Sequence, residues 1–100
     1  MKRSLDDKIA EARLKKYIKI TETALGSISV GSDDRSHLHR TAKDVVSMVE
    51  AYLSDAKRFF AHGAYVDAFA CVNYAHGWLD AGARIGLYKV TKNRELFTID

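Results

Sequence analysis

The chain has 100 residues, the usual length of one domain, so residues 1–100 are expected to form a single domain. Hydrophobic residues make up 47% of it, which argues against a disordered chain, and no apolar run approaches the ~20 residues that a membrane span needs. The net charge of +3 permits nucleic acid as a partner but does not demand one.

The cysteine content and the first residues indicate a compartment. Cys71 is the only cysteine, which excludes an internal disulfide and a cysteine-based metal cage. Lys2 and Arg3 are followed by Asp6 and Asp7, whereas a secretory signal would continue with an apolar run. We therefore expect a cytoplasmic protein without a membrane segment, a metal or a cofactor.

A first helix is predicted over residues 4–25. Ser4 is a suitable N-cap, and Gly26 is a natural residue just beyond a helix end. Apolar residues cover much of the circumference of this segment, including Leu5, Leu14 and Ile20. Such a wide apolar arc predicts contact on two sides, with another helix of the chain or with another subunit.

A second helix is predicted over residues 34–62, after a loop of serine, glycine and aspartate. Its apolar residues recur with helical spacing along one stripe: Leu38, Ala42, Val45, Val46, Val49, Tyr52, Leu53, Ala56 and Phe60. Charged and polar residues such as Lys43 and Glu50 fall on the opposite side. This pattern is typical of an amphipathic helix that lies on a core.

A third helix is predicted over residues 65–87, followed by a polar tail at 89–100. The helix is apolar on nearly every side, which predicts that other helices enclose it. In the tail, residues 95–99 are consistent with a short strand or an extended arm. The three long helices and their short loops indicate an all-α fold, an antiparallel three-helix bundle with the third helix central.

One face of the third helix consists of small residues. Ala68, Ala75, Gly82 and Gly86 project in nearly the same direction and form a candidate close-packing seam. A glycine inside a helix costs about 1 kcal/mol relative to alanine, so the two glycines need a reason. Close approach of another helix is the simplest one, either within the chain or across a homodimer, and packing within the chain is favoured.

A second face of this helix is polar. Asn73, His76, Asp80 and Arg84 form a stripe, and the spacing of four residues suits an ion pair between Asp80 and Arg84 and a contact between His76 and Asp80. The aromatic side chains nearest the stripe belong to Tyr74 and Trp78. A buried network with Asp55 or Arg58 of the second helix explains such groups more simply than a binding groove does.

The functional hypotheses follow from these two faces. A non-enzymatic module that binds a protein partner or self-associates, as in a homodimer, is the leading hypothesis. The alternative is a bundle that binds RNA or a small ligand through the polar stripe. An enzyme is not expected, because no nucleophile stands beside a base, and the pair His37 and His39 lacks a recognised metal-ligand spacing.

Two segments resemble known families. Phe59-Phe-Ala-His-Gly-Ala-Tyr65 and Asn73-Tyr-Ala-His-Gly-Trp-Leu-Asp80 resemble an archaeal family of small helical proteins, known as domain of unknown function 357. That resemblance implies a helical archaeal protein and no reaction, cofactor or partner. Gly63-Ala-Tyr-Val-Asp-Ala68 is loosely similar to nucleotide-associated helical bundles of toxin–antitoxin systems. Their ribonuclease members space an arginine and a histidine more widely than Arg58 and His62, so the catalytic motif is absent.

Overall fold

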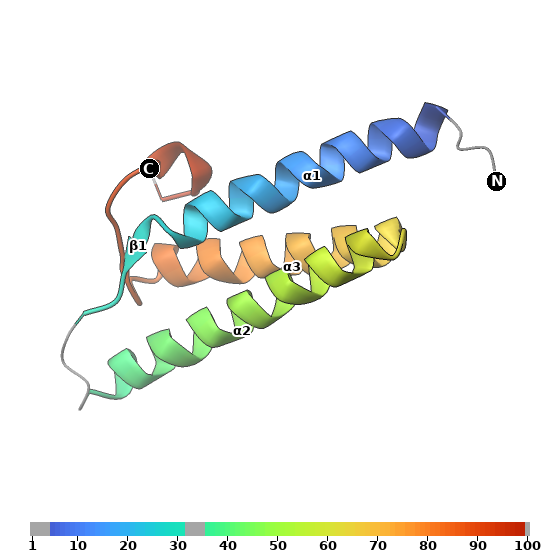
Figure 1. Cartoon of the computed structure of the whole chain (residues 1–100). Coiled ribbons are helices and arrows are strands. Elements are labelled where there is room, and N and C mark those ends of the chain that lie inside the picture. Colours follow the sequence, from blue (N-terminus) through green and yellow to red (C-terminus); the bar gives the residue numbers. More distant parts are fainter. Residues whose placement is uncertain (1–4, 32–35, 100) are drawn as a thin grey trace.

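The computed structural model of the chain describes residues 5–31 and 36–99 and contains three long helices. Helices α1 (Leu5–Leu25) and α3 (Tyr65–Arg84) run in one direction and α2 (His37–Ala61) runs in the other, as Figure 1 shows. Two short antiparallel strands, β1 (Ile28–Ser29) and β2 (Lys89–Val90), set Ile28 opposite Val90. The predicted all-α three-helix bundle is confirmed, and the small hairpin is an addition to it.

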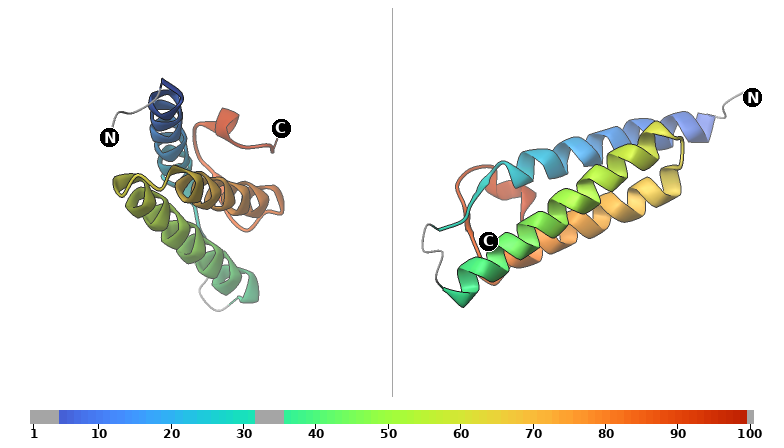
Figure 2. Two further views of the ribbon diagram at one scale, coloured as in Figure 1. Left: turned by 90° about the vertical axis from the view of Figure 1, so that its right-hand side faces the viewer. Right: turned by 60° about the horizontal axis from the view of Figure 1, so that its bottom comes forward.

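Helix α3 lies at the centre of the packing. It packs along α2 and also touches α1, and α1 and α2 touch one another, so the central position and the two-sided contact of α1 are confirmed. The end-on view in Figure 2 shows the C-terminal segment beside α1 and α3. Within the described ranges, no helix is both long and apolar enough to cross a membrane.

The core divides into two clusters along the bundle. The cluster near the middle of α1 joins all three helices through Leu14, Ile18, Leu53, Ala56, Ala68 and Val72. The other lies where the hairpin and the tail fold back, and it is formed by Ala24, Ala42, Val45, Val49, Ala75, Leu79, Ala83, Tyr88 and Phe97. The second cluster makes the tail a structural part of the bundle, because Tyr88 and Phe97 are 6% and 7% exposed.

Helix α2 begins at His37 because Ser36 caps it. The Ser36 hydroxyl accepts a hydrogen bond from the backbone N–H of His39 at 2.9 Å, and this satisfies one of the unpaired donors at the helix start. The predicted start at residue 34 lies outside the described residues. The predicted end at His62 is correct within one residue, since His62 is the C-cap.

Helix α3 ends at Arg84, three residues before the predicted end at 87. Gly86 has a φ of +83°, and the N–H groups of Gly86 and Leu87 bond to the carbonyls of Ala83 and Gly82 at 3.1 and 2.9 Å. This is the glycine-terminated helix end in which two backbone N–H groups close the last turn. The prediction that Gly86 belongs to a helical seam is therefore wrong. Gly86 lies beyond the end of α3, at the point where the chain reverses direction.

Two further expectations are corrected. Residues 95–99 do not form a strand, because Arg94–Leu96 is a 3-10 turn, named η1, preceded by Asn93 in the left-handed conformation with φ 55°. Nor is α3 enclosed on every side. Val66, Tyr74, Trp78 and Ile85 are 83%, 51%, 39% and 72% exposed. The bundle is only 16 Å across in its thinnest direction. A helix with its side chains is about 10 Å thick, so there is no room for a further helix on each side of α3 in that direction.

Candidate functional site

Asp80 and Arg84 hold the same residue of the tail. Oδ1 of Asp80 accepts the backbone N–H of Thr98 and Oδ2 accepts its hydroxyl, both at 2.7 Å. Nη1 of Arg84 donates to the carbonyl oxygen of Thr98 at 2.5 Å. The expected ion pair between Asp80 and Arg84 is not formed, since each side chain takes a different polar group of Thr98.

His76 connects α1 to the tail. Its Nε2 lies 2.9 Å from the carbonyl oxygen of Leu96, and its Nδ1 lies 3.1 Å from Oγ1 of Thr21. A carbonyl oxygen only accepts, so Nε2 carries the proton in the neutral ring and Nδ1 accepts the hydroxyl of Thr21. The expected contact with Asp80 is absent among these bonds, and both ring nitrogens of His76 are occupied.

The predicted polar stripe is thus largely a clasp for the tail. His76, Asp80 and Arg84 all bind backbone groups of residues 96–98, while Asn73 is exposed and has no hydrogen-bond partner among the described residues. The expectation that Asp55 or Arg58 of the second helix would bond to the stripe is wrong. The sequence carries no signal for the role of Thr98, because nothing in a polar tail marks which hydroxyl returns to which helix.

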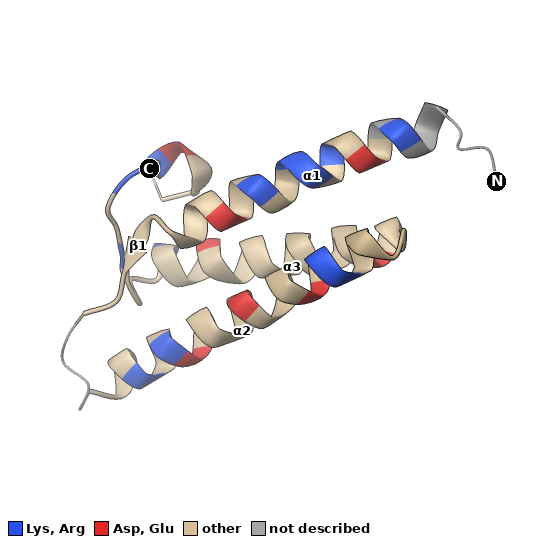
Figure 3. Cartoon of the chain, viewed as in Figure 1, with Lys and Arg blue, Asp and Glu red and all other residues tan. Residues whose placement is uncertain are grey.

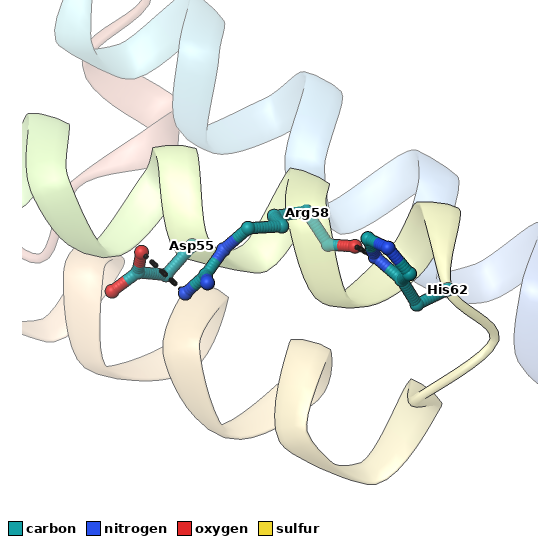
Figure 4. Close-up of polar contacts among 3 residues, drawn as sticks. All are labelled: Asp55, Arg58 and His62. Carbon is teal, nitrogen blue, oxygen red and sulfur yellow. Dashed lines mark hydrogen bonds and ion pairs between the residues drawn. The ribbon is translucent and has the colours of Figure 1, made fainter.

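Asp55 and Arg58 instead pair with one another on the surface of α2. Nη2 of Arg58 lies 3.1 Å from Oδ1 of Asp55, and Nδ1 of His62 lies 2.8 Å from the carbonyl oxygen of Arg58 (Figure 4). The guanidinium also lies over the ring of Phe59, 5.2 Å from its centroid. Each bonded pair is only three or four residues apart along α2 and its C-cap His62, so the group is a local surface arrangement and not a link between helices.

Tyr74 and Trp78 stand on the outer side of α3. The ring of Tyr74 makes edge-to-face contacts with Tyr52 of α2, at a centroid distance of 4.7 Å, and with Trp78, at 6.3 Å. Such contacts fix the orientation of the rings. About half of Tyr74 and two fifths of Trp78 nevertheless remain accessible, with 51% and 39% exposure. The two aromatics are therefore held in place at the surface.

The small-residue seam is not one continuous surface. Ala68 and Ala75 are fully buried in the two core clusters, in agreement with packing inside the chain. At Gly82 the close neighbour is not a helix but Tyr88, whose ring would lie 2.6 Å (Cζ) from a Cβ placed on that glycine. The four residues therefore do not share one partner: the two alanines lie in the core, Gly82 faces Tyr88, and Gly86 lies beyond the end of α3.

Tyr88 occupies the space that Gly82 leaves. Its hydroxyl donates to the carbonyl oxygen of Leu79 at 2.5 Å, inside the core. Burial of the phenol, with a smaller contribution from the nearby charge of Asp80, raises the pKa of Tyr88 to about 12. The side chain thus stays neutral, and its hydrogen bond to Leu79 holds the segment after Gly86 against the end of α3.

Two hollows flank the outer side of α3. A groove of about 510 Å³ runs between α1 and α3, and Tyr17, Asn73, His76 and Gly77 are among its lining residues. A shallower hollow of about 320 Å³ lies on α3 itself and is lined by Asn73, Tyr74, Gly77, Trp78 and Ala81. Gly77 contributes to both, because it has no side chain to fill them. Among the described residues, no cluster of three potential ligands could hold a metal ion.

A family model described as "Protein of unknown function (DUF357)" matches residues 16–88. The chain belongs to this family, as its two motifs in α2 and α3 predicted. The match takes in the second half of α1, all of α2 and α3, and the chain reversal to Tyr88; it stops before the tail. No curated protein and no solved structure matches the chain.

Proposed function

We propose that the protein is a non-enzymatic interaction module that binds an apolar helix of a protein partner through the exposed side of α3. This surface, the α3 face, is formed by the exposed residues Val66, Ala70, Tyr74, Gly77, Trp78 and Ala81 of α3 and by its C-cap residue Ile85. The observation that carries the proposal is the exposure of its four large side chains, which ranges from 39% to 83%. Contiguous apolar residues at a surface are typical of binding sites, whereas single exposed ones are ordinary.

The absence of charge from the middle of this helix supports the same proposal. Residues 68–79 contain no aspartate, glutamate, lysine or arginine, and α3 is largely tan in Figure 3 where α1 carries many blue segments. Cores of protein interfaces are depleted in charge and enriched in tyrosine and tryptophan, which are also the commonest residues to dominate binding energy. Tyr74 and Trp78 are both present, and their mutual contacts limit the entropy lost on binding.

The non-enzymatic part of the proposal rests on how the titratable groups are used. Both nitrogens of His76 are bonded within the chain, and both carboxylate oxygens of Asp80 are bonded to Thr98. A general base needs a free lone pair within reach of a substrate proton, and the neutral ring of His76 has none left, while Asp80 is held in place by its two bonds to Thr98. These groups therefore serve better as structural bonds than as catalytic ones.

Photo-crosslinking in the source cells tests the proposal. Benzophenone-alanine would replace Tyr74 on the α3 face in one variant and Lys43, exposed on the far side of α2, in a matched control. We expect covalent adducts from position 74 that are lost when Ala70→Glu is added, because a carboxylate on the face cannot be buried without a partner. Adduct formation from position 43 at the same level as from position 74 would refute the α3 face as a binding surface.

The groove between α1 and α3 supports a second candidate, binding of RNA or a small anionic ligand. Tyr17 and Asn73 line it, Asn73 has unused amide donors and acceptors, and Arg13 and Lys16 are exposed on α1 without a partner among the described residues. Aromatic rings with nearby cations suit single-stranded nucleic acid. Titration of Trp78 fluorescence with a single-stranded RNA, with Asn73→Ala and Arg13→Glu as variants, tests it. An unchanged affinity in both variants would exclude this groove.

A further inference from the structure

We propose that the partner helix is α3 of a second copy of this chain, and that the two helices pair antiparallel across a two-fold axis level with Ala75 and His76. This inference rests on the proposed function of the α3 face and names its occupant. A two-fold interface uses the same surface on both copies, so the face must be complementary to itself. The order of residue types along α3 meets this requirement.

In the antiparallel register, side chains of matching size lie opposite one another. When Val66 lies level with Ile85 of the second copy, Ala70 lies level with Ala81 and Tyr74 lies level with Gly77. The two alanines let the helix backbones approach closely, and the tyrosine ring meets a position without a side chain. At both ends a branched apolar residue meets another, and these are the two most exposed large apolar residues of the described chain.

The hollow beside Gly77 suits the tyrosine of a second copy. A space of about 320 Å³ opens there between Asn73, Tyr74, Trp78 and Ala81. A Cβ placed on Gly77 would have no neighbour within 4 Å, so no group of the same chain fills the space. In the antiparallel register the Tyr74 ring of the second copy arrives at this level. Each copy thus supplies both the ring and the hollow that receives it.

The charges at the two ends of α3 favour the antiparallel over the parallel arrangement. Asp67 and Arg84 are exposed near opposite ends of α3. Antiparallel pairing brings Asp67 level with Arg84 of the second copy, whereas parallel pairing sets acid beside acid and base beside base. Arg84 keeps further N–H groups for this contact, because it uses only Nη1 on Thr98. The parallel register would also oppose Tyr74 with Tyr74 and leave the two hollows unfilled.

The size of the surface predicts a reversible dimer. Helix α3 has 20 residues and is therefore about 30 Å long. One helix face of this length buries less than the roughly 800 Å² per partner of a standard stable interface. We expect a mass that rises from that of the 11.2 kDa monomer toward twice that value as the concentration increases through the micromolar range.

Cysteine cross-linking tests the register. In a Cys71→Ser background, Ala70→Cys and Ala81→Cys are combined in one chain and are also made singly. Within one helix these positions are about 16 Å apart, too far for a disulfide inside the chain. We expect the double variant to form a covalent dimer on mild oxidation, at least tenfold faster than either single variant, and reducing agent to reverse it. Circular dichroism of the reduced proteins checks that all three retain the helical fold.

The outcomes are distinct from those of the photo-crosslinking experiment. Rapid dimerisation of the single Ala70→Cys variant would show a parallel pair and overturn the register. A strictly monomeric mass at every concentration, with no disulfide dimer from the double variant, would overturn self-association. In that case adducts of position 74 with another protein would still support the α3 face as a binding surface. Adducts of position 74 with this chain itself, together with the disulfide of the double variant, establish the second copy.

Discussion

Asp80 binds Thr98 with both carboxylate oxygens, one on the backbone N–H and one on the hydroxyl, across 18 residues of the chain. Arg84, one turn further along α3, takes the remaining carbonyl of the same residue. Thr98 therefore has its backbone and side-chain polar groups all bound by one helix. Together with the burial of Phe97, these bonds close the tail over the end of the bundle.

Replacement of Asp80 by asparagine should loosen the tail. The amide keeps one acceptor but loses the charge and the second acceptor, so we expect a loss of about 1–2 kcal/mol in the free energy of unfolding. Trypsin should then cleave faster at Lys92 and Arg94, which lie in the released segment. Urea unfolding and timed proteolysis measure the two effects. Asp67→Asn, on the exposed side of α3, is the control, and equal cleavage rates in the two variants would contradict the clasp.

The two partnered histidines should differ in tautomer. His76 places Nε2 on a backbone carbonyl, whereas His62 places Nδ1 on one, so the neutral rings should carry their protons on Nε2 and Nδ1 respectively. Nitrogen-15 chemical shifts of the ring atoms, recorded at a pH where both rings are neutral, distinguish these forms. His62 thus serves as the internal reference for His76. A proton on Nδ1 of His76 would mean that its bond to Leu96 is not formed.

The helices could be predicted from the sequence because their signals are local. Apolar spacing defines α2 and most of its buried stripe, although Leu38 at the start of the helix is 66% exposed; Gly26 and Gly63 mark the ends of α1 and α2. The end of α3 was missed because Gly86, although a typical glycine beyond a helix end, was assigned to the helix through its match to the seam. A residue that continues a helical pattern can equally well terminate the helix, and spacing alone does not distinguish the two.

The partners of the polar stripe could not be predicted because they come from a distant segment. His76, Asp80 and Arg84 were correctly placed near one another, but spacing favoured bonds between them, while the structure gives each a group of residues 96–98. A tail without regular secondary structure has no periodicity that indicates where it packs. The exposure of Tyr74 and Trp78 also depends on the thinness of the bundle, which is a property of three helices packed together and not of one.

Two glycines of α3 make a matched pair for mutation. Gly77→Ala adds a methyl group to open space and removes the cost of glycine in a helix, so we expect the free energy of unfolding to rise by about 1 kcal/mol. Gly82→Ala places the same methyl group against the ring of Tyr88. Overpacking lowers the free energy of unfolding by about 1–3 kcal/mol, which should outweigh the gain in helix propensity. Urea unfolding of both variants measures the difference. Stabilisation by Gly82→Ala would show that Tyr88 does not lie against this turn.

Tyr88 should make stability fall at high pH. Its pKa is raised to about 12 in the folded chain, while the unfolded phenol titrates near 10. Between these values the folded state holds a proton that the unfolded state has lost, so this contribution to stability is complete below pH about 10 and disappears as the pH rises toward 12. The physical reason is that a phenolate cannot donate to the carbonyl of Leu79 and is poorly solvated in the core.

Tyr88→Phe separates this effect from general alkaline unfolding. The phenylalanine has no ionisable group, so the decline in the free energy of unfolding above pH about 10 should become shallower, while stability at neutral pH drops by about 1 kcal/mol through the lost hydrogen bond. Tyr52→Phe is the matched control, because it removes the hydroxyl of a tyrosine that is only partly buried. Unfolding by urea at a series of pH values measures all three proteins. If the free energy of unfolding fell with pH equally in the wild type and in Tyr88→Phe, the loss of stability at high pH would come from other groups. The hydroxyl of Tyr88 would then not be a buried contact at the end of α3.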